Sequence, residues 1–349
     1  TGITTGGYNT SVGSQAFVVN TTGDGNVAAG YGALDANTTA HYNVAIGYQA
    51  LTANTTAGGN VAVGMQALAA NTTGLYNVAV GQYALDAEVG GDFSVAVGFN
   101  ALTTQNAASA GDNVHNVAVG SYAGNSLTTG TLSVFIGGHA GGGATISGDN
   151  NVGIGYSALN AISTGEGNTA VGYLAGTAVT TCTNNVMIGR NAVSQAALTG
   201  TQNTVVGNNA GYVMIDAANN NTLLGDAAGF ALTTGDNCLF LGHDTGRTGS
   251  PGGNITTGSN EIVLGDESIT ESHIQVDWTV ASDERDKTDF TALDVGLDFV
   301  NALAPVTYKW DKRSKYIDKT DPSVDLDAVS HDGTHKEDWL DIGFKAQEV

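Results

Sequence analysis

Basic residues are scarce in this chain, and most of them lie near one end. The 349 residues include 11 Lys and Arg against 33 Asp and Glu, which gives a formal net charge of −22. Up to Ala281 the only basic residues are Arg190 and Arg247, and the other nine follow Ser282. Nucleic-acid binding depends on Lys and Arg that neutralise phosphates, so we do not expect the chain to bind DNA or RNA.

Cysteine, proline and long apolar segments are scarce as well. The two cysteines, Cys182 and Cys238, lie in different copies of the repeat described below, too far apart for a disulfide, so we predict small core or surface residues. No signal peptide, membrane span or anchor is apparent, and we expect no membrane insertion. His331 and His335 stand four apart, but Gly333 between them favours a solvated loop over a helical metal site. We expect no metal and no cofactor.

Glycine, in contrast, is abundant, with 50 residues, and it marks a repeat. The glycine that closes each copy, here called the marker glycine, recurs at Gly13, Gly30, Gly47, Gly64, Gly81, Gly98, Gly120, Gly137, Gly155, Gly172, Gly189, Gly207, Gly225, Gly242 and Gly265. Most steps are 17 or 18 residues, and the steps from Gly98 to Gly120 and from Gly242 to Gly265 are longer. A short fixed period over most of a chain predicts a solenoid of stacked coils.

The residues before each marker glycine have the pattern of a β-strand. The copy that ends at Gly64 has Val61 and Val63 three and one residues before it, with Ala62 between them. Side chains alternate along a strand, so one face is bulky and the other small, and both are apolar. This pattern predicts a strand of a parallel sheet that is buried on both sides. A helix is disfavoured because β-branched residues dominate and a glycine ends each run.

Two polar features recur with the same period. Asparagine stands four residues before most marker glycines, and stacked coils would align these amides into a ladder; a polar binding face is the alternative. The triplets that begin at Asn37, Asn54 and Asn71 formally match glycosylation sites, but their spacing favours turns of the repeat. A second short apolar segment reads Ala-Leu in early copies and Ala-Gly in later ones.

A coil of this length is too thin to bury two apolar faces. We expect the alanine-rich face to be covered by other copies of the chain, in a parallel homotrimer. Asn43-Val44-Ala45-Ile46-Gly47 resembles the head repeats of trimeric autotransporter adhesins, whose motif is Asn-x-Val-Ala-Ile-Gly. This resemblance covers roughly residues 9 to 265 and implies a left-handed parallel β-roll trimer, although the family's period is shorter. Fifteen coils would make a rod on the order of 70 Å long.

A different kind of sequence follows the repeats. We divide the chain into a rod over residues 1–265, a neck over 266–281 and a third part over 282–349. An alternating strand is predicted at 272–280, with Trp278 as a cap on the apolar stack. Beyond it the pattern predicts a helix over 293–303, a strand over 306–310 and a further element from Ile342. The predicted fold is therefore all-β, a parallel β-solenoid of about fifteen coils, followed by a small α+β segment.

Three blocks in this last part carry a second resemblance. They are Ser282-Asp283-x-Arg285-x-Lys287, Leu303-x-Pro305-Val306-x-Tyr308-x-Trp310 and Gly343-Phe344-x-Ala346-Gln347-Glu348-Val349. The stretch resembles the C-terminal intramolecular chaperone domain of phage tailspikes, tail fibres and endosialidases. The family's domain trimerises, assists the folding of the preceding fibre, and then cleaves itself off.

Carried over to this chain, the resemblance places the cut between Ser282 and Asp283, with Ser282 as the nucleophile and Lys287 as its base. A serine hydroxyl needs such a neighbouring base to attack an amide. The alternative is that Ser282 caps a turn and Lys287 is a solvated charge. Asp286 departs from the family pattern, which has an apolar residue there.

These patterns support one function first and leave two others open. The first is a trimeric phage tail fibre or spike that binds the host surface, located in the virion tail outside the cell. Its expected partners are other tail proteins and a host receptor, most plausibly a glycan, bound by the longer loops Thr103–Asn113 and Asp244–Gly258.

The first alternative is a bacterial trimeric adhesin. The second is a spike that degrades polysaccharide, for which Asp86 with Glu88, or Asp266 with Glu267, would have to supply paired carboxylates. A calcium-binding β-roll is disfavoured because the acidic nonapeptide pattern is absent. No enzymatic activity is expected of the rod itself. The one reaction considered is a single self-cleavage at the start of the chaperone part. The sequence starts without Met and stops within the chaperone pattern, so we expect further chain on both sides.

Overall fold

The computed structural model describes residues 5–107, 109, 111–195, 197–273, 306–309, 336 and 341–343. The chain divides into two compact units, Thr1–Ser272 and His273–Val349, which are described separately here.

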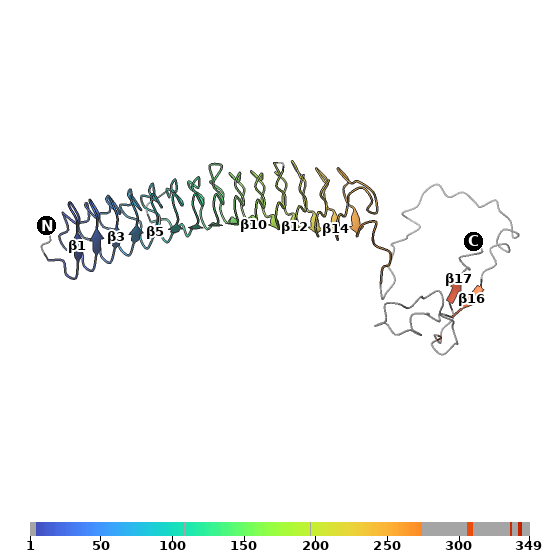
Figure 1. Ribbon diagram of the computed structural model, residues 1–349, viewed down its shortest axis with the longest axis horizontal. Coiled ribbons are helices and arrows are strands. Elements are labelled where there is room, and N and C mark those ends of the chain that lie inside the picture. Colours follow the sequence, from blue (N-terminus) through green and yellow to red (C-terminus); the bar gives the residue numbers. More distant parts are fainter. Residues whose placement is uncertain are drawn as a thin grey trace. The chain divides into compact units, whose positions relative to one another are not determined.

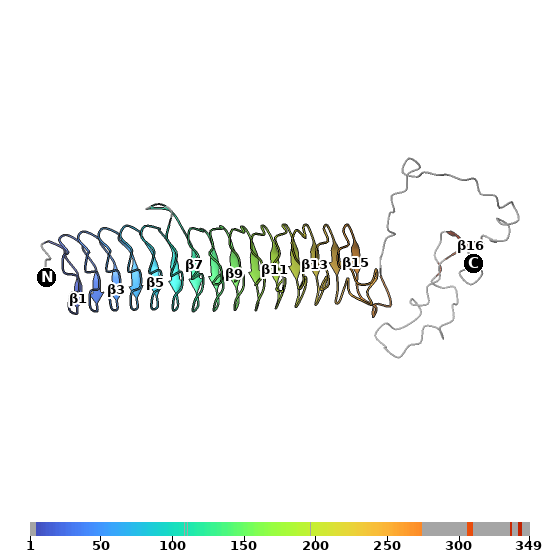
Figure 2. The ribbon, with the colours of Figure 1, turned by 90° about the horizontal axis from the view of Figure 1, so that it is seen from above.

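The first unit is a parallel β-solenoid (Figures 1 and 2), as the sequence predicts. Its 15 short strands form one sheet in which neighbours in the chain are neighbours in space. They are β1 (Thr10–Val12), β2 (Val27–Ala29), β3 (Val44–Ile46), β4 (Val61–Val63), β5 (Val78–Val80), β6 (Val95–Val97), β7 (Val117–Val119), β8 (Val134–Ile136), β9 (Val152–Ile154), β10 (Thr169–Val171), β11 (Val186–Ile188), β12 (Thr204–Val206), β13 (Thr222–Leu224), β14 (Leu239–Leu241) and β15 (Ile262–Leu264).

Each strand ends at its marker glycine because no other residue fits there. Gly47 has a φ of +140°, a conformation that side chains rarely adopt. A Cβ atom on Gly47 would lie 2.3 Å from the carbonyl oxygen of Gly64 in the next coil. The marker glycines therefore stack with their backbones in close approach, and this stacking fixes where every strand stops.

The pairing register is constant along the rod. Val61 pairs with Val78 and Val78 pairs with Val95, one repeat apart. The two longer steps leave the register unchanged, since Val95 pairs with Val117 and Leu239 with Ile262. The extra residues of these steps therefore lie outside the ladder, and Figure 2 shows the loop between β6 and β7 projecting beyond the row of turns.

The two faces of the strands are used in the opposite way from the one expected. The small middle residue of each strand points into the coil; Ala62, for example, is fully buried and belongs to the same core as Leu68. The bulky residues point outward, and Ile46 is 42% exposed. Within a single chain, the prediction that both faces of the strands are buried is therefore wrong. The alanine-rich face is buried inside the coil, and the Val and Ile face is the one left exposed. The interior of a narrow coil has room for alanine opposite leucine, so the larger β-branched side chains lie outside.

Large and small residues exchange places inside the coils. Where the middle strand residue is Phe135, the corner residue of the same coil is Gly141 instead of leucine. A Cβ atom on Gly141 would lie 2.5 Å from the Phe135 ring. Phe240 and Gly246 repeat the arrangement, also at 2.5 Å. In these two coils, phenylalanine in the strand and glycine at the corner therefore fill the volume that alanine and leucine fill in the Ala-Leu copies.

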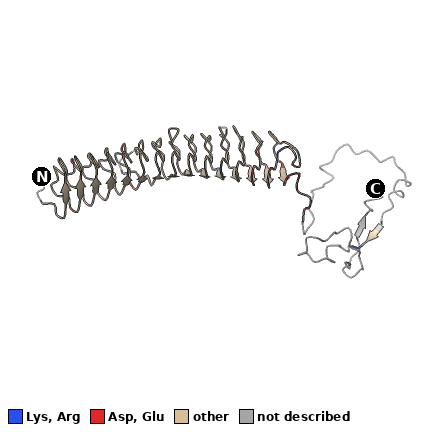
Figure 3. Ribbon diagram, viewed as in Figure 1, with Lys and Arg blue, Asp and Glu red and all other residues tan. Residues whose placement is uncertain are grey.

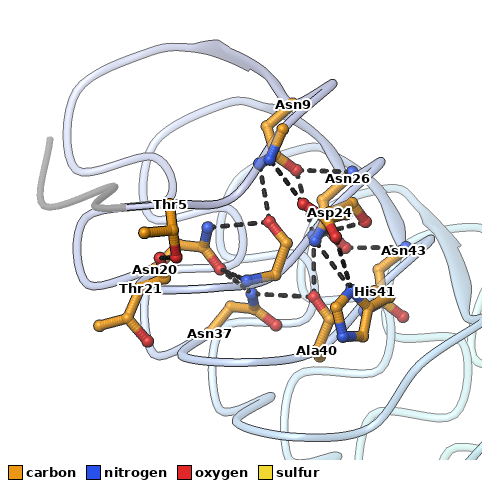
Figure 4. A network of polar contacts seen from close by, with 12 residues as sticks. Thr5, Asn9, Asn20, Thr21, Asp24, Asn26, Asn37, Ala40, His41 and Asn43 are labelled. Atoms are coloured by element: carbon orange, nitrogen blue, oxygen red, sulfur yellow. Dashed lines mark hydrogen bonds and ion pairs between the residues drawn. The ribbon is translucent and has the colours of Figure 1, made fainter.

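The predicted asparagine ladder is present. In Figure 4 the Asn26 side chain donates from Nδ2 to the Ala40 carbonyl at 2.9 Å, and its Oδ1 accepts from the Asn43 amide at 2.9 Å. These asparagines are buried, so the alternative of a polar binding face does not hold. A second buried ladder contains Asn37, Asn54 and Asn71, which confirms that the Asn-Thr-Thr triplets are repeat turns.

In the second unit, the structure describes one antiparallel pair, β16 (Val306–Tyr308) with β17 (Asp341–Gly343). This pair confirms the strand predicted near 306–310 and the element predicted near Ile342. The predicted helix over 293–303 and nearly all of the neck strand over 272–280 lie outside the described residues. Among the residues described, no helix is long and apolar enough to cross a membrane.

Candidate interaction surfaces of the solenoid

The predicted catalytic pair, Ser282 and Lys287, lies outside the described residues, as do His331 and His335. The features available for function in the described chain are therefore surfaces of the rod.

One face of the rod is apolar along its length. The described residues include 23 exposed large hydrophobic side chains, and 19 of them stand five, three or one residues before a marker glycine, or directly after one. We call the two columns on the strands, three and one residues before each marker glycine, the outer face, and the column on either side of them its border. The two middle columns are the outward residues of the strands, such as Val80 at 36% exposed, and the other two border the strands. An apolar surface this continuous is unusual on a protein that works alone.

Aromatic side chains line the borders of the outer face in stacks. Tyr76 stacks on Phe93 with ring centroids 5.4 Å apart, and Phe93 stacks on His115 at 5.1 Å. On the other border, Tyr31 stacks on Tyr48 at 5.4 Å. Further stacked pairs are Tyr122–His139, Tyr156–Tyr173 and Tyr212–Phe230. Aromatic residues at repeat spacing thus lie one above the other on the surface, not in the core.

The loop between β6 and β7 is anchored by a buried carboxylate. Glu88 is fully buried, and its Oε1 accepts from the Gly91 amide at 2.7 Å and the Ala107 amide at 3.3 Å. Its Oε2 accepts from the Gln105 side chain at 2.9 Å. Because Glu88 lies inside the coil, it cannot face a sugar together with Asp86. Partial burial of Asp86 raises the pKa of its own carboxyl group. The first carboxylate pair considered for glycoside hydrolysis is therefore not arranged for it.

The other acidic pair considered, Asp266 and Glu267, lies in a charged cluster at the end of the rod. The His243 Nδ1 atom is 2.9 Å from Oδ2 of Asp266, and its Nε2 atom is 3.7 Å from carboxylate oxygens of Asp226 and Asp244. The contact with Asp266, followed by the charge of Asp244, raises the pKa of His243. The same hydrogen bond lowers the pKa of Asp266. Asp266 thus contacts the preceding coil through His243, and its Oδ2 atom is engaged in that contact.

The two cysteines are free and buried, as expected. Cys238 occupies an asparagine-ladder position, and its backbone amide donates to Oδ1 of Asn221 at 3.0 Å, as the asparagines of the ladder do. Burial raises the pKa of the Cys182 thiol to about 11, so it stays protonated and is not a nucleophile. In the described part of the chain, no group of three His, Cys, Asp or Glu residues could hold a metal ion.

Figure 3 shows that the rod carries few charges. The cluster around His243 follows β14, the last strand but one of the rod. The second longer loop, which begins at Asp244, is tied to this part of the rod. The Arg247 guanidinium bonds to Asp244 and lies 4.7 Å from the centre of the Phe230 ring. This loop is therefore folded against the coils.

Comparison with known proteins identifies the last part of the chain. Residues 282–349 match a peptidase family described as chaperone of endosialidase. No curated protein and no solved structure matches the chain. The match begins at Ser282, the residue at which composition changes and the resemblance to tail-fibre chaperones starts. The chain thus joins a parallel β-solenoid to a segment that matches the endosialidase-chaperone family, an architecture consistent with phage tail fibres and endosialidase-like proteins.

Proposed function

We propose that this chain is the shaft of a bacteriophage tail fibre or spike, a trimer that binds the host surface. The observation that carries the proposal is the endosialidase-chaperone match at residues 282–349, directly after a fifteen-stranded solenoid. A parallel sheet of this kind forms from contacts between coils and is exposed to mispairing during folding. A chaperone made as part of the same chain would act where that risk is greatest.

The outer face supports a homotrimer. Other copies of the chain would cover the Val and Ile columns, in place of the alanine columns that the sequence first suggested. Such a cover would remove from water a row of side chains that includes Val12 at 64% and Leu224 at 51% exposed. Apolar burial of this kind is the main driving force of association. Coils of one repeat length in all copies would keep such contacts in register along the rod.

The proposed chemistry at residue 282 is a single self-cleavage. The Ser282 hydroxyl, with its proton taken by Lys287, would attack the carbonyl of its own peptide bond to Asp283. Because Oγ and the carbonyl carbon belong to one residue, the ester that forms is a four-membered β-lactone. It closes as the C–N bond breaks and the amine of Asp283 leaves with the proton from Lys287, and water then opens the lactone to a Ser282 carboxylate and the free hydroxyl. The released solenoid would remain in the virion tail, with tail proteins and a host glycan as its partners.

The test is the size of the subunit. The whole gene, when expressed, is expected to yield a product shortened at residue 282, whereas Ser282→Ala and Lys287→Ala yield the uncleaved chain. Ser272→Ala, a change of an exposed serine in the same region, serves as the control and should be cleaved normally. Uncleaved wild-type protein, or normal cleavage of Ser282→Ala, would contradict the proposed role of Ser282.

A further inference from the structure

One aromatic stack on the border of the outer face ends beside the projecting loop. Tyr76, Phe93 and His115 are the rings of this stack; their planes are nearly parallel, with interplanar angles of 14° and 10°. Tyr76 is 56% and Phe93 40% exposed, and His115 is exposed too. Since the rings cover one another's faces, their edges form an apolar ridge across β5, β6 and β7.

The stem of the loop is bonded to the residue that precedes Phe93. The Asp92 amide donates to the Asp112 carbonyl at 2.9 Å, and the His115 amide donates to the Asp92 carbonyl at 3.4 Å. Asp92 and Asn113 also form a parallel bridge. The loop stem and the ring ridge are therefore adjacent parts of one surface.

The loop is tied to the preceding coil by Glu88. This buried carboxylate accepts from the Gly91 amide in its own turn and from the Ala107 amide in the loop, although buried carboxylates without a cationic partner are rare in proteins. The Gly111 amide donates to the Gly90 carbonyl at 2.8 Å. A costly buried group that fixes a surface loop is typical of a site whose geometry matters.

The polar groups beside the ridge suit hydroxyl groups. Asn113 is exposed, and no described residue hydrogen-bonds its side-chain amide, which can both donate and accept. Asp112 is partly exposed, with Oδ2 accepting from the Ser109 amide at 2.7 Å. The chain contains no Lys or Arg before Arg190, so nothing here would neutralise an anionic ligand.

We propose that Tyr76, Phe93, Asp112, Asn113 and His115 form a binding site for an uncharged glycan. A sugar ring has an apolar C–H face, which would lie on the ring ridge, and a rim of hydroxyls, which would bond Asn113 and Asp112. The inference rests on the proposed function, since it names the place and the ligand class of the host contact. Within the loop Thr103–Asn113, where the sequence led us to expect receptor binding, it places the contact at the loop stem and the adjoining rings.

The test is binding to a printed array of uncharged hexose, deoxyhexose and N-acetylhexosamine oligosaccharides that also carries sialylated and uronate-containing members. The wild-type chain is expected to bind uncharged members, and Asn113→Ala and His115→Ala to bind them at least about tenfold more weakly. Tyr156→Ala removes an exposed stacked ring with no projecting loop beside it and should leave binding unchanged. Equal binding by the Asn113 and His115 variants, or binding of acidic members alone, overturns the inference.

A second measurement separates this inference from the proposed function. Fluorescent wild-type chain is applied to a panel of bacteria, before and after periodate oxidation of the surface sugars. Adsorption that is lost on oxidation and in Asn113→Ala supports the glycan site. Adsorption that is equal in the wild type and the variants leaves host binding intact and overturns this site, whereas a wild type that adsorbs to no strain overturns host binding itself.

Discussion

At the scale of single residues, the recurrence of asparagine four places before the marker glycine was enough to predict a ladder. What recurrence could not show is which atoms matter. Ser133 replaces asparagine in one coil, and its hydroxyl still accepts from the Asn151 amide at 3.1 Å. Cys238 replaces it in another. The shared feature of Asn and Ser at this position is therefore a side-chain oxygen that accepts from the backbone amide of the next coil. The second bond, which the asparagine side-chain amide donates, is absent in the serine coil.

This distinction leads to a prediction at Asn60. Its Oδ1 accepts from the Asn77 amide at 2.8 Å and its Nδ2 donates to the Gly74 carbonyl at 2.9 Å. Asn60→Ala leaves the buried Asn77 amide without a partner, whereas the Gly74 carbonyl keeps its bond from the Asn71 side chain, and we expect the change to reduce the free energy of unfolding by about 1–3 kcal/mol. Asn60→Ser keeps an acceptor and should cost less than half as much. Chemical denaturation followed by circular dichroism measures both.

Thr56→Ala changes an exposed threonine of a neighbouring turn and serves as the matched control for this comparison. Serine and alanine variants of equal stability would mean that the bonds of Asn60 contribute little and that packing alone holds the ladder.

His243 leads to a prediction about pH. Its pKa is raised, so its contact with Asp266 stabilises the last coils fully below the ordinary histidine value of 6.5, and this stabilisation is lost as pH rises through the raised pKa. The pKa of Asp266 is lowered, so the contact is also lost as pH falls through that lowered value. The contact is therefore present between these two pKa values.

NMR titration of protein with labelled histidine measures this effect. Asp266→Asn should lower the pKa of His243, because the hydrogen-bonding carboxylate is the largest cause of the shift. Gln66→Ala, a change in a distant coil, should leave it unchanged. A His243 pKa that is the same with and without Asp266 would contradict the contact.

At the scale of the strand and its coil, the sequence was sufficient to locate all 15 strands and their register. The spacing of glycine carries this information directly, since each marker glycine stacks on the next. The direction of the faces was not predictable from alternation alone, because both faces are apolar. The width of the coil decides which face points inward. That width is set by the turns, which place Leu68 and Ala62 in one core.

The exchange of volume inside the coil leads to a prediction at Phe135 and Gly141. Phe135→Ala should cost about 3–5 kcal/mol, since it leaves a cavity. Gly141→Leu should be destabilising by about 1–3 kcal/mol or more, because the new side chain overlaps the Phe135 ring. The double variant should recover much of the loss, since it recreates the Ala-Leu coil. The backbone permits it: Gly141 has a φ of +59° and Leu68, in the equivalent place, +51°.

The measurement is a double-mutant cycle by denaturation. Leu159, the corner residue of the next coil, offers the matched control: Phe135→Ala combined with Leu159→Met should show no such recovery. Additive losses at Phe135 and Gly141 would mean that the two coil types are not interchangeable.

At the scale of the whole molecule, the sequence predicted the architecture and the family of its end. The blocks from Ser282 onward are matched by the endosialidase-chaperone family. The interaction surfaces were harder to predict. Stacks such as Tyr76, Phe93 and His115 are separated by 17 and 22 residues in sequence and become one surface only when the coils stack. The anchor at Glu88 was also missed, since a single acid in a turn carries no repeat signal.

The outer face leads to the last prediction. Val80 is 36% exposed in the single chain, so Val80→Lys should leave the coil folded, with an unchanged circular dichroism spectrum. If copies pack through the outer face, this charge is buried at the interface without a partner, and the variant should dissociate, with a mass in analytical ultracentrifugation about one third of the wild type's. Thr56→Lys places the same charge on an exposed turn away from the outer face and should stay associated. A wild type that sediments as a monomer, or a Val80→Lys protein that stays associated, would mean that something other than a second copy covers the outer face.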